Sequence, residues 1–196
     1  MPESQLKLSV RVYDYSGIAT RTLLAAGKEA AAVLEKTGFK TEWQFCEAAQ
    51  GQRPQTCDAP LRPGEIAVRI ARRAKPHNGA LGCTKCGAAV ENADGLGSYA
   101  TLYADCLDTM PSVDGLLPSA MLGHLLAHEI GHLLLRGEDH SRQGIMRPQM
   151  REDDWKLAAV GALVFTPRQA ALLRAEVAIR QRGEERAAAE RAANPE

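Results

Sequence analysis

The spacing of apolar residues predicts that strands and helices alternate in the first two thirds of the chain. Residues 6–15 alternate apolar and polar side chains, with the period of two that is typical of a half-buried strand. Residues 18–36 place leucine and alanine at helical spacing, and Gly38 follows as a stop signal. Alternation predicts strands over residues 6–15, 65–72 and 98–104, and a short aromatic-containing run predicts another over residues 42–46.

The last third of the chain is predicted to be mostly helical. A long apolar run predicts a helix over residues 119–135, and a second helix is expected over residues 152–164. A third helix is expected to start at Thr166, because Pro167 follows in the first turn and Gln169 lies three residues after the cap.

The order of these elements predicts an α/β layer with a long helix late in the chain. Residues 76–97 are rich in glycine, show no regular period, and are expected to be irregular. Residues 181–196 lack large apolar side chains and predict a solvated or frayed helical tail. We therefore expect one domain over residues 1–180 and a tail over residues 181–196.

Composition excludes several classes of function. The chain has 196 residues, with 24 Lys and Arg against 24 Asp and Glu. This balance argues against a basic nucleic-acid surface. Because the chain has no apolar run of about eighteen residues, we expect no membrane span. The first residues lack the basic start and apolar stretch of a signal peptide, so the sequence predicts either a cytosolic protein or a mature exported form.

The five cysteines favour export. Cys46 and Cys57 flank a polar segment, residues 47–56, and predict a disulfide that closes it as a loop. Cys83 and Cys86 form a C-x-x-C without a second ligand pair, so we expect a structural role, as a disulfide or as buried thiols. Cys106 stands alone, and the odd count leaves at least one free thiol. This usage predicts a secreted or periplasmic protein, with a cytoplasmic location left open.

The chemistry of the chain is concentrated in residues 128–132, which read H-E-x-x-H. On a helix, His128 and His132 share one face with Cβ atoms about 5–6 Å apart, so both imidazoles can reach one zinc ion. Glu129 is displaced around the helix, where it can act as the general base on a metal-activated water. Titratable residues in an apolar helix are costly unless something pairs with them, and a metal would satisfy all three.

A catalytic zinc site usually has three protein ligands, so a third is expected just past the long helix. Glu138, Asp139 and His140 are candidates, and His140 is favoured by ligand preference. Asp139 is then expected to orient an imidazole or to cap the turn. His124, one turn before His128, is expected to support the site from behind or to be structural.

These residues resemble the metzincin metallopeptidases. The segments that carry the resemblance are His128-Glu129-Ile130-Gly131-His132, Asp139-His140-Ser141 and Gly144-Ile145-Met146-Arg147-Pro148. The family motif is H-E-x-x-H-x-x-G-x-x-H followed by a methionine-bearing turn, and bacterial proteins with H-E-I-G-H-L-L-L and H-S-x-x-G-I-M are similar too. This chain departs from the family spacing, since its third histidine comes two residues later and Leu135 stands at the glycine position.

The resemblance implies a fold, a cofactor and an activity. It implies a zincin-like α/β (α+β) fold with a twisted mixed sheet, on which the N-terminal helix and the H-E-x-x-H helix pack. It further implies that Met146 forms a floor beneath the metal. An edge strand within residues 79–97 would bind an extended peptide. The expected activity is zinc-dependent hydrolysis of peptide bonds in a peptide or protein substrate, as in a metallo-endopeptidase.

Two other readings stay open at this point. The chain could be an inactive zinc-binding or scaffold protein, although such a protein has no use for Glu129. It could also be a redox or metal-sensing protein built on Cys83, Cys86 and Cys106. The sequence predicts neither the cleavage preference nor the oligomeric state.

Overall fold

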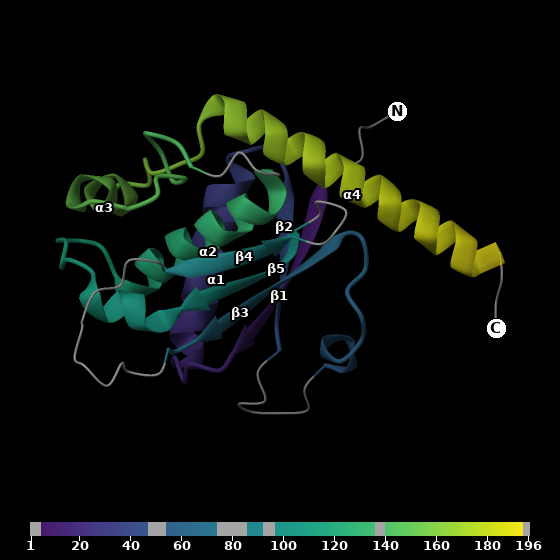
Figure 1. Cartoon of the computed structure of the whole chain (residues 1–196), viewed down its shortest axis with the longest axis horizontal. Helices are drawn as coiled ribbons and strands as arrows, with labels where there is room; N and C mark the ends of the chain where they lie inside the picture. The colour runs from purple at the N-terminus through teal and green to yellow at the C-terminus, as the bar shows by residue number, and fades with distance from the viewer. Residues whose placement is uncertain (1–4, 47–53, 74–85, 92–96, 136–139, 194–196) are drawn as a thin grey trace.

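The computed structural model describes residues 5–46, 54–73, 86–91, 97–135 and 140–193. These residues form one sheet with helices packed on it, in the order β1-α1-β2-β3-β4-β5-α2-α3-α4 with two short 3-10 turns (Figure 1). This mixed α/β architecture confirms the predicted fold class. In the described part of the chain, no helix is long and apolar enough to cross a membrane.

The sheet has five strands in the order β2-β1-β3-β5-β4. Its strands are β1 (Lys7–Asp14), β2 (Lys40–Phe45), β3 (Glu65–Ala71), β4 (Gly87–Glu91) and β5 (Gly97–Tyr103). The pairs β1–β2, β1–β3 and β3–β5 are parallel, whereas β4 pairs antiparallel with β5. The strand β4 lies inside the stretch expected to be irregular, and it forms an edge of the sheet. The edge strand implied by the resemblance is therefore present.

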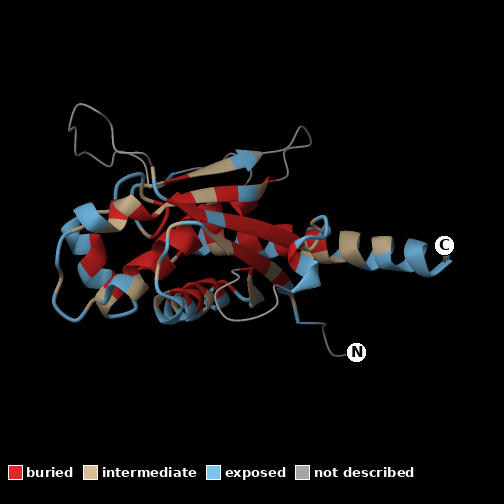
Figure 2. Cartoon of the chain, turned by 90° about the horizontal axis from the view of Figure 1, so that it is seen from below, coloured by how far each residue is buried: buried red, intermediate tan, exposed pale blue. Residues whose placement is uncertain are grey.

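Two helices, α1 (Thr20–Glu35) and α2 (Pro118–Leu135), pack against each other and against the sheet. Fourteen of the eighteen residues of α2 are buried, because α1, α3, α4 and the strands β4 and β5 surround it. The helices approach closely at Gly123, where an added Cβ would lie 2.7 Å from the carbonyl oxygen of Ala26. Figure 2 shows the buried residues concentrated in the sheet and the helices beside it.

The C-terminal helix α4 (Pro167–Ala193) is anchored through buried charges. Arg180 Nη2 donates to the carbonyl oxygens of Gly97 at 2.8 Å and Leu133 at 3.2 Å, and its Nε donates to Glu176 at 2.8 Å. Arg180 thereby ties α4 to the start of β5 and to the last turn of α2. The C-terminal end of the helix projects from the body of the molecule (Figures 1 and 2), and the domain boundary at residue 180 stays a prediction.

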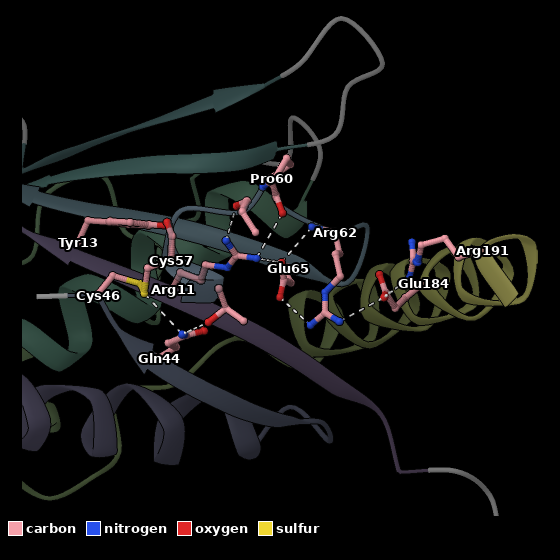
Figure 3. A network of polar contacts seen from close by, with 12 residues as sticks. Arg11, Tyr13, Gln44, Cys46, Cys57, Pro60, Arg62, Glu65, Glu184 and Arg191 are labelled. Carbon is pink, nitrogen blue, oxygen red and sulfur yellow. Dashed lines mark hydrogen bonds and ion pairs between the residues drawn. A yellow bond between two sulfur atoms is a disulfide. The ribbon is translucent and has the colours of Figure 1, made fainter. Parts of the chain in front are cut away.

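A network of ion pairs joins the sheet to α4 on the face opposite α1 (Figure 3). Arg11 is buried, pairs with Glu65, and donates to the carbonyl oxygen of Ala59 at 2.7 Å. Arg62 bridges Glu65 at 2.9 Å and Glu184 of α4 at 3.7 Å. Burial alone would raise the pKa of Glu65, but its hydrogen bonds from Arg62 and the charge of Arg11 outweigh burial and lower it.

The helix predicted over residues 152–164 is shorter in the structure. Helix α3 spans Glu152–Ala159 and ends because Gly161 adopts a left-handed conformation with φ 68°. The N–H groups of Gly161 and Ala162 bond to the carbonyl oxygens of Ala158 and Leu157, which satisfies the last turn. The prediction that α4 starts after a Thr166 cap is confirmed, since Gln169 N–H donates to Thr166 Oγ1.

The structure pairs four cysteines. Cys46 and Cys57 form the predicted disulfide, with Cα atoms 5.6 Å apart. Cys86 pairs with Cys106, so the expectation that Cys106 stands alone is wrong. Because β4 and β5 are antiparallel, the residue before β4 and the turn after β5 meet at the same end of the sheet. Cys83 lies outside the described residues, and none of the described cysteines is free.

We predict that Cys46→Ser lowers the free energy of unfolding by about 3 kcal/mol, because the disulfide limits the unfolded chain. Cys46 and Cys57 are both buried, so loss of the bond between them also loosens the end of β2. Denaturant unfolding of wild type and variant measures the difference. With a thiol reductant the two proteins should unfold nearly alike. An equal difference with and without reductant would assign the effect to packing and not to the covalent bond.

Candidate active site and metal centre

The first two candidate ligands are brought together by one turn of α2. His128 is buried and His132 is half-buried, and their Nε2 atoms are 3.0 Å apart. His140, which is exposed, comes from the segment after the helix, with ring centroids 5.7 Å from His128 and 4.8 Å from His132. One ligand atom from each histidine lies within 4.8 Å of the other two. Three imidazoles thus converge on one point, although they are not contiguous in sequence.

The protonation of His128 is set by its surroundings. Its Nδ1 donates to the carbonyl oxygen of Ile145 at 2.7 Å, which leaves the lone pair on Nε2, the atom facing His132. The pKa of His128 is lowered to about 4, mainly by burial and also by the nearby charges of His132 and His140, which together outweigh the opposing effect of the hydrogen bond to Ile145. The ring is therefore neutral near pH 7, the state in which an imidazole binds a metal.

The segment after His140 packs against helix α2. Ile145 and Met146 are fully buried, and the N–H of Ser141 donates to the carbonyl oxygen of Met146 at 2.9 Å. Gly131, between the two helical histidines, faces this turn. An added Cβ there would meet the sulfur of Met146 and would lie 2.8 Å from the ring of Phe165. Glycine at position 131 thus lets α2 approach the turn.

Glu129 lies between α2 and the edge strand of the sheet. Its side chain is buried, and a Cβ added to Gly87, the first residue of β4, would collide with its carboxylate. The absence of a side chain at Gly87 therefore makes room for Glu129 beside the strand. Sequence reasoning missed this role of Gly87, since a glycine-rich stretch alone does not say which glycine meets another element.

The two other supporting residues predicted from sequence have different outcomes. His124 is fully buried, and its Nδ1 donates to the carbonyl oxygen of Ala120 at 2.9 Å and lies 3.8 Å from Glu29 of α1. Burial lowers its pKa. These contacts lie on the α1 side of the helix, and a supporting role toward the metal stays a prediction. Asp139, like Glu138, lies outside the described residues.

A cavity of about 1440 Å³ contains this constellation. Its walls come from the start of β4, the 3-10 turn η2 (Ala104–Thr109) with the residues after it, α2, and residues 140–151. Glu129 and the three converging histidines all line it, as do both cysteines of the Cys86–Cys106 pair. The cavity thus brings together a group of side chains that could hold a metal, a buried carboxylate and the beginning of an edge strand.

Comparison with known proteins places the fold. No protein-family model matches the chain, and no curated protein sequence matches it. The crystal structure of archaemetzincin from Methanopyrus kandleri matches with a TM-score of 0.57 at 12% identity, covering 91% of this chain and 99% of that chain. The crystal structure of a zinc-dependent peptidase from Methanocorpusculum labreanum (strain Z) matches with a TM-score of 0.52 at 14% identity, covering 84% and 99%. The chain therefore shares the overall fold of these two solved structures.

Proposed function

We propose that this protein is a zinc-dependent metallopeptidase, with an endopeptidase mode of cleavage. The observation that carries the proposal is the convergence of His128, His132 and His140 in one cavity with the buried Glu129. The fold shared with two solved zinc peptidase structures agrees with it.

The three histidines fit a zinc ion. Zinc in catalytic sites takes three nitrogen or oxygen ligands at about 2.0–2.1 Å and keeps one position open. Neutral imidazoles suit it, and the Nε2 atoms of His128 and His132 face each other at 3.0 Å, a separation that a shared cation between them accounts for. The hydrogen bond from His128 to Ile145 orients that ring from behind, as in many metal sites.

Glu129 supplies the proton transfers in this proposal. When bound, zinc polarises the scissile carbonyl and makes water more acidic. Glu129 takes the proton from the attacking water and delivers it to the leaving amine. Its burial between α2 and β4 keeps the carboxylate in one place and excludes bulk water. A purely structural zinc site would not need this group.

The edge strand β4 is the proposed substrate platform. Among the strands that the structure describes, β4 pairs with β5 alone, and its first residues line the cavity. An extended peptide can add to its free edge through backbone hydrogen bonds, which bind without regard to sequence. Gly87 would bring such a peptide past the carboxylate of Glu129.

The rival readings receive less support. A redox or metal-sensing role needs accessible thiols, yet Cys86 and Cys106 are paired and Cys106 is fully buried. The two disulfides favour an oxidising compartment, which agrees with a secreted or periplasmic location.

We predict that the wild-type protein binds one zinc ion and that His140→Ala weakens zinc binding by at least about 100-fold. Loss of a ligand should cost more metal affinity than loss of a group that only hydrogen-bonds to a ligand. His140 is exposed, so the variant should fold. Metal titration with a competing chelator gives the affinity, and Gln143→Ala, in the same turn, is the matched control. Unchanged affinity in His140→Ala would remove this residue from the ligand set.

We predict that Glu129→Gln keeps zinc and loses about 10²–10⁴-fold in kcat, since the amide is nearly isosteric but cannot accept the proton. Cleavage of a peptide library, followed by mass spectrometry, is the assay. Glu152→Gln changes an exposed carboxylate outside the cavity and should match wild type. Hydrolysis at the wild-type rate in Glu129→Gln would show that another group is the base.

We predict that Gly87→Ala lowers kcat by up to about 10²-fold while zinc affinity and stability stay close to wild type. The new methyl group collides with the end of a flexible side chain, so the Glu129 carboxylate moves and the backbone does not. Val90→Ala, an exposed position on the same strand, is the control. A large loss of stability instead would mean that Gly87 serves the packing of β4.

A further inference from the structure

One wall of the cavity is positively charged. The segment of residues 140–151 contains three arginines and no acidic residue, in a chain whose charges balance overall. Arg142, Arg147 and Arg151 all line the cavity. Among the described residues that line it, Glu129 is the only carboxylate. The net charge of the described wall is therefore positive before any metal is counted.

The three arginines have different surroundings. Arg147 is three-quarters covered, and its Nε lies 3.3 Å from Asp154 Oδ2. The same carboxylate accepts the backbone N–H of Arg151 at 2.8 Å, so Asp154 serves both the start of α3 and Arg147. Arg142 and Arg151 are exposed, and neither makes an ion pair with the described part of the chain.

The acidic residues of α3 do not cancel this charge inside the cavity. Glu152 and Asp153 pair with Lys156 at 2.9 and 3.4 Å, and neither lines the cavity. Asp154 is buried beneath Arg147 and offsets one guanidinium at most. Within the described residues, no carboxylate pairs with the guanidinium groups of Arg142 and Arg151, which line the same cavity as the proposed reaction centre.

The charged wall is held in a defined position relative to the histidines. Arg142 follows His140 by two residues, and Arg147 directly follows the buried Met146. The turn between them is closed by the hydrogen bond from Ser141 to Met146 and is joined to α2 by the hydrogen bond from His128 to Ile145. The backbone that carries Arg142 and Arg147 thus also carries His140 and orients the ring of His128.

We propose that this wall selects peptide substrates that carry a carboxylate near the scissile bond, with Arg142 and Arg151 as its principal partners. The inference rests on the proposed peptidase function and names its substrate class. Guanidinium groups bind carboxylates through two parallel hydrogen bonds, which gives geometric preference as well as attraction. The carboxylate has two possible sources, an acidic side chain or the C-terminal carboxylate of a short peptide.

The test compares matched peptides derived from a cleaved library sequence. In the first pair both C-termini are amidated, and the two peptides differ only in an internal glutamate or glutamine. In the second pair the side chains are neutral, and the two peptides differ only in a free or an amidated C-terminus. In the favoured pair we expect kcat/KM to be about 5- to 20-fold higher for the charged peptide, the effect of one or two exposed ion pairs. The preference should shrink as ionic strength rises.

Charge-reversal variants test whether the preference for carboxylate-bearing peptides depends on the arginines of the cavity wall. Arg142→Glu/Arg151→Glu should abolish or invert it, whereas Arg21→Glu/Arg182→Glu makes the same change of charge at exposed positions on α1 and α4 and should retain it. If the double reversal misfolds, Arg151→Gln alone, at an exposed site, should at least halve the preference. A preference that survives in the reversed or the single variant overturns the proposal.

Binding to zinc-loaded Glu129→Gln separates this inference from the proposed function. Fluorescence anisotropy with the same labelled peptides requires no turnover. Peptides that are cleaved, or bound, equally well with and without the carboxylate overturn the inference and leave the peptidase proposal intact. If wild type cleaves no peptide of the library, the same binding assay is run with matched peptides of an arbitrary library sequence, and carboxylate-dependent binding would then retain the recognition while the peptidase activity is overturned.

Discussion

The hydrogen bond from Nδ1 of His128 to the carbonyl oxygen of Ile145 links the two parts of the chain on which the candidate site depends. His128 belongs to the buried helix α2, whereas Ile145 belongs to the turn that brings His140 back toward that helix. The bond satisfies a buried imidazole nitrogen and a buried carbonyl at once, and leaving either unpaired would cost about 1–3 kcal/mol. It also turns Nε2 of His128 toward His132 and His140.

Helix α2 can carry titratable groups because its neighbours hold it from several sides. Gly123 lets α1 pack closely against the helix, and Gly131 does the same for Met146 and Phe165. Arg180 of α4 donates to the carbonyl oxygen of Leu133 in the last turn of α2. Close packing makes each of these contacts sensitive to the addition of a single methyl group. The helix is therefore a rigid support for Glu129, with little freedom to relax around it.

The cavity beside α2 combines elements with different physical roles. The strand β4 lies at the edge of the sheet formed by the described strands, and the Cys86–Cys106 pair ties its beginning to the turn after β5. The segment after His140 adds positive charge on another wall. Backbone pairing along a strand edge is independent of sequence, so side-chain selectivity in such a cleft has to come from walls of this kind.

The sequence by itself determined the elements whose signal is local. Alternation placed β1, β3 and β5, a short aromatic-containing run placed β2, and helical spacing placed α1 and α2. The five residues from His128 to His132 located the candidate metal site. The loop disulfide between Cys46 and Cys57 was also predictable, because the two cysteines flank a short polar segment.

Only the tertiary structure decided which distant residues meet. Cys86 pairs with Cys106 because β4 runs antiparallel to β5, and nothing in the C-x-x-C spacing indicates that direction. Strand β4 itself has no clear period, since its first residues are small and line a cavity instead of a core. The clearance that Gly87 gives Glu129, and the carbonyl that orients His128, depend on how separate elements pack. A local pattern records the environment of a residue along its own element, whereas these contacts are set by the positions of elements far apart in the chain.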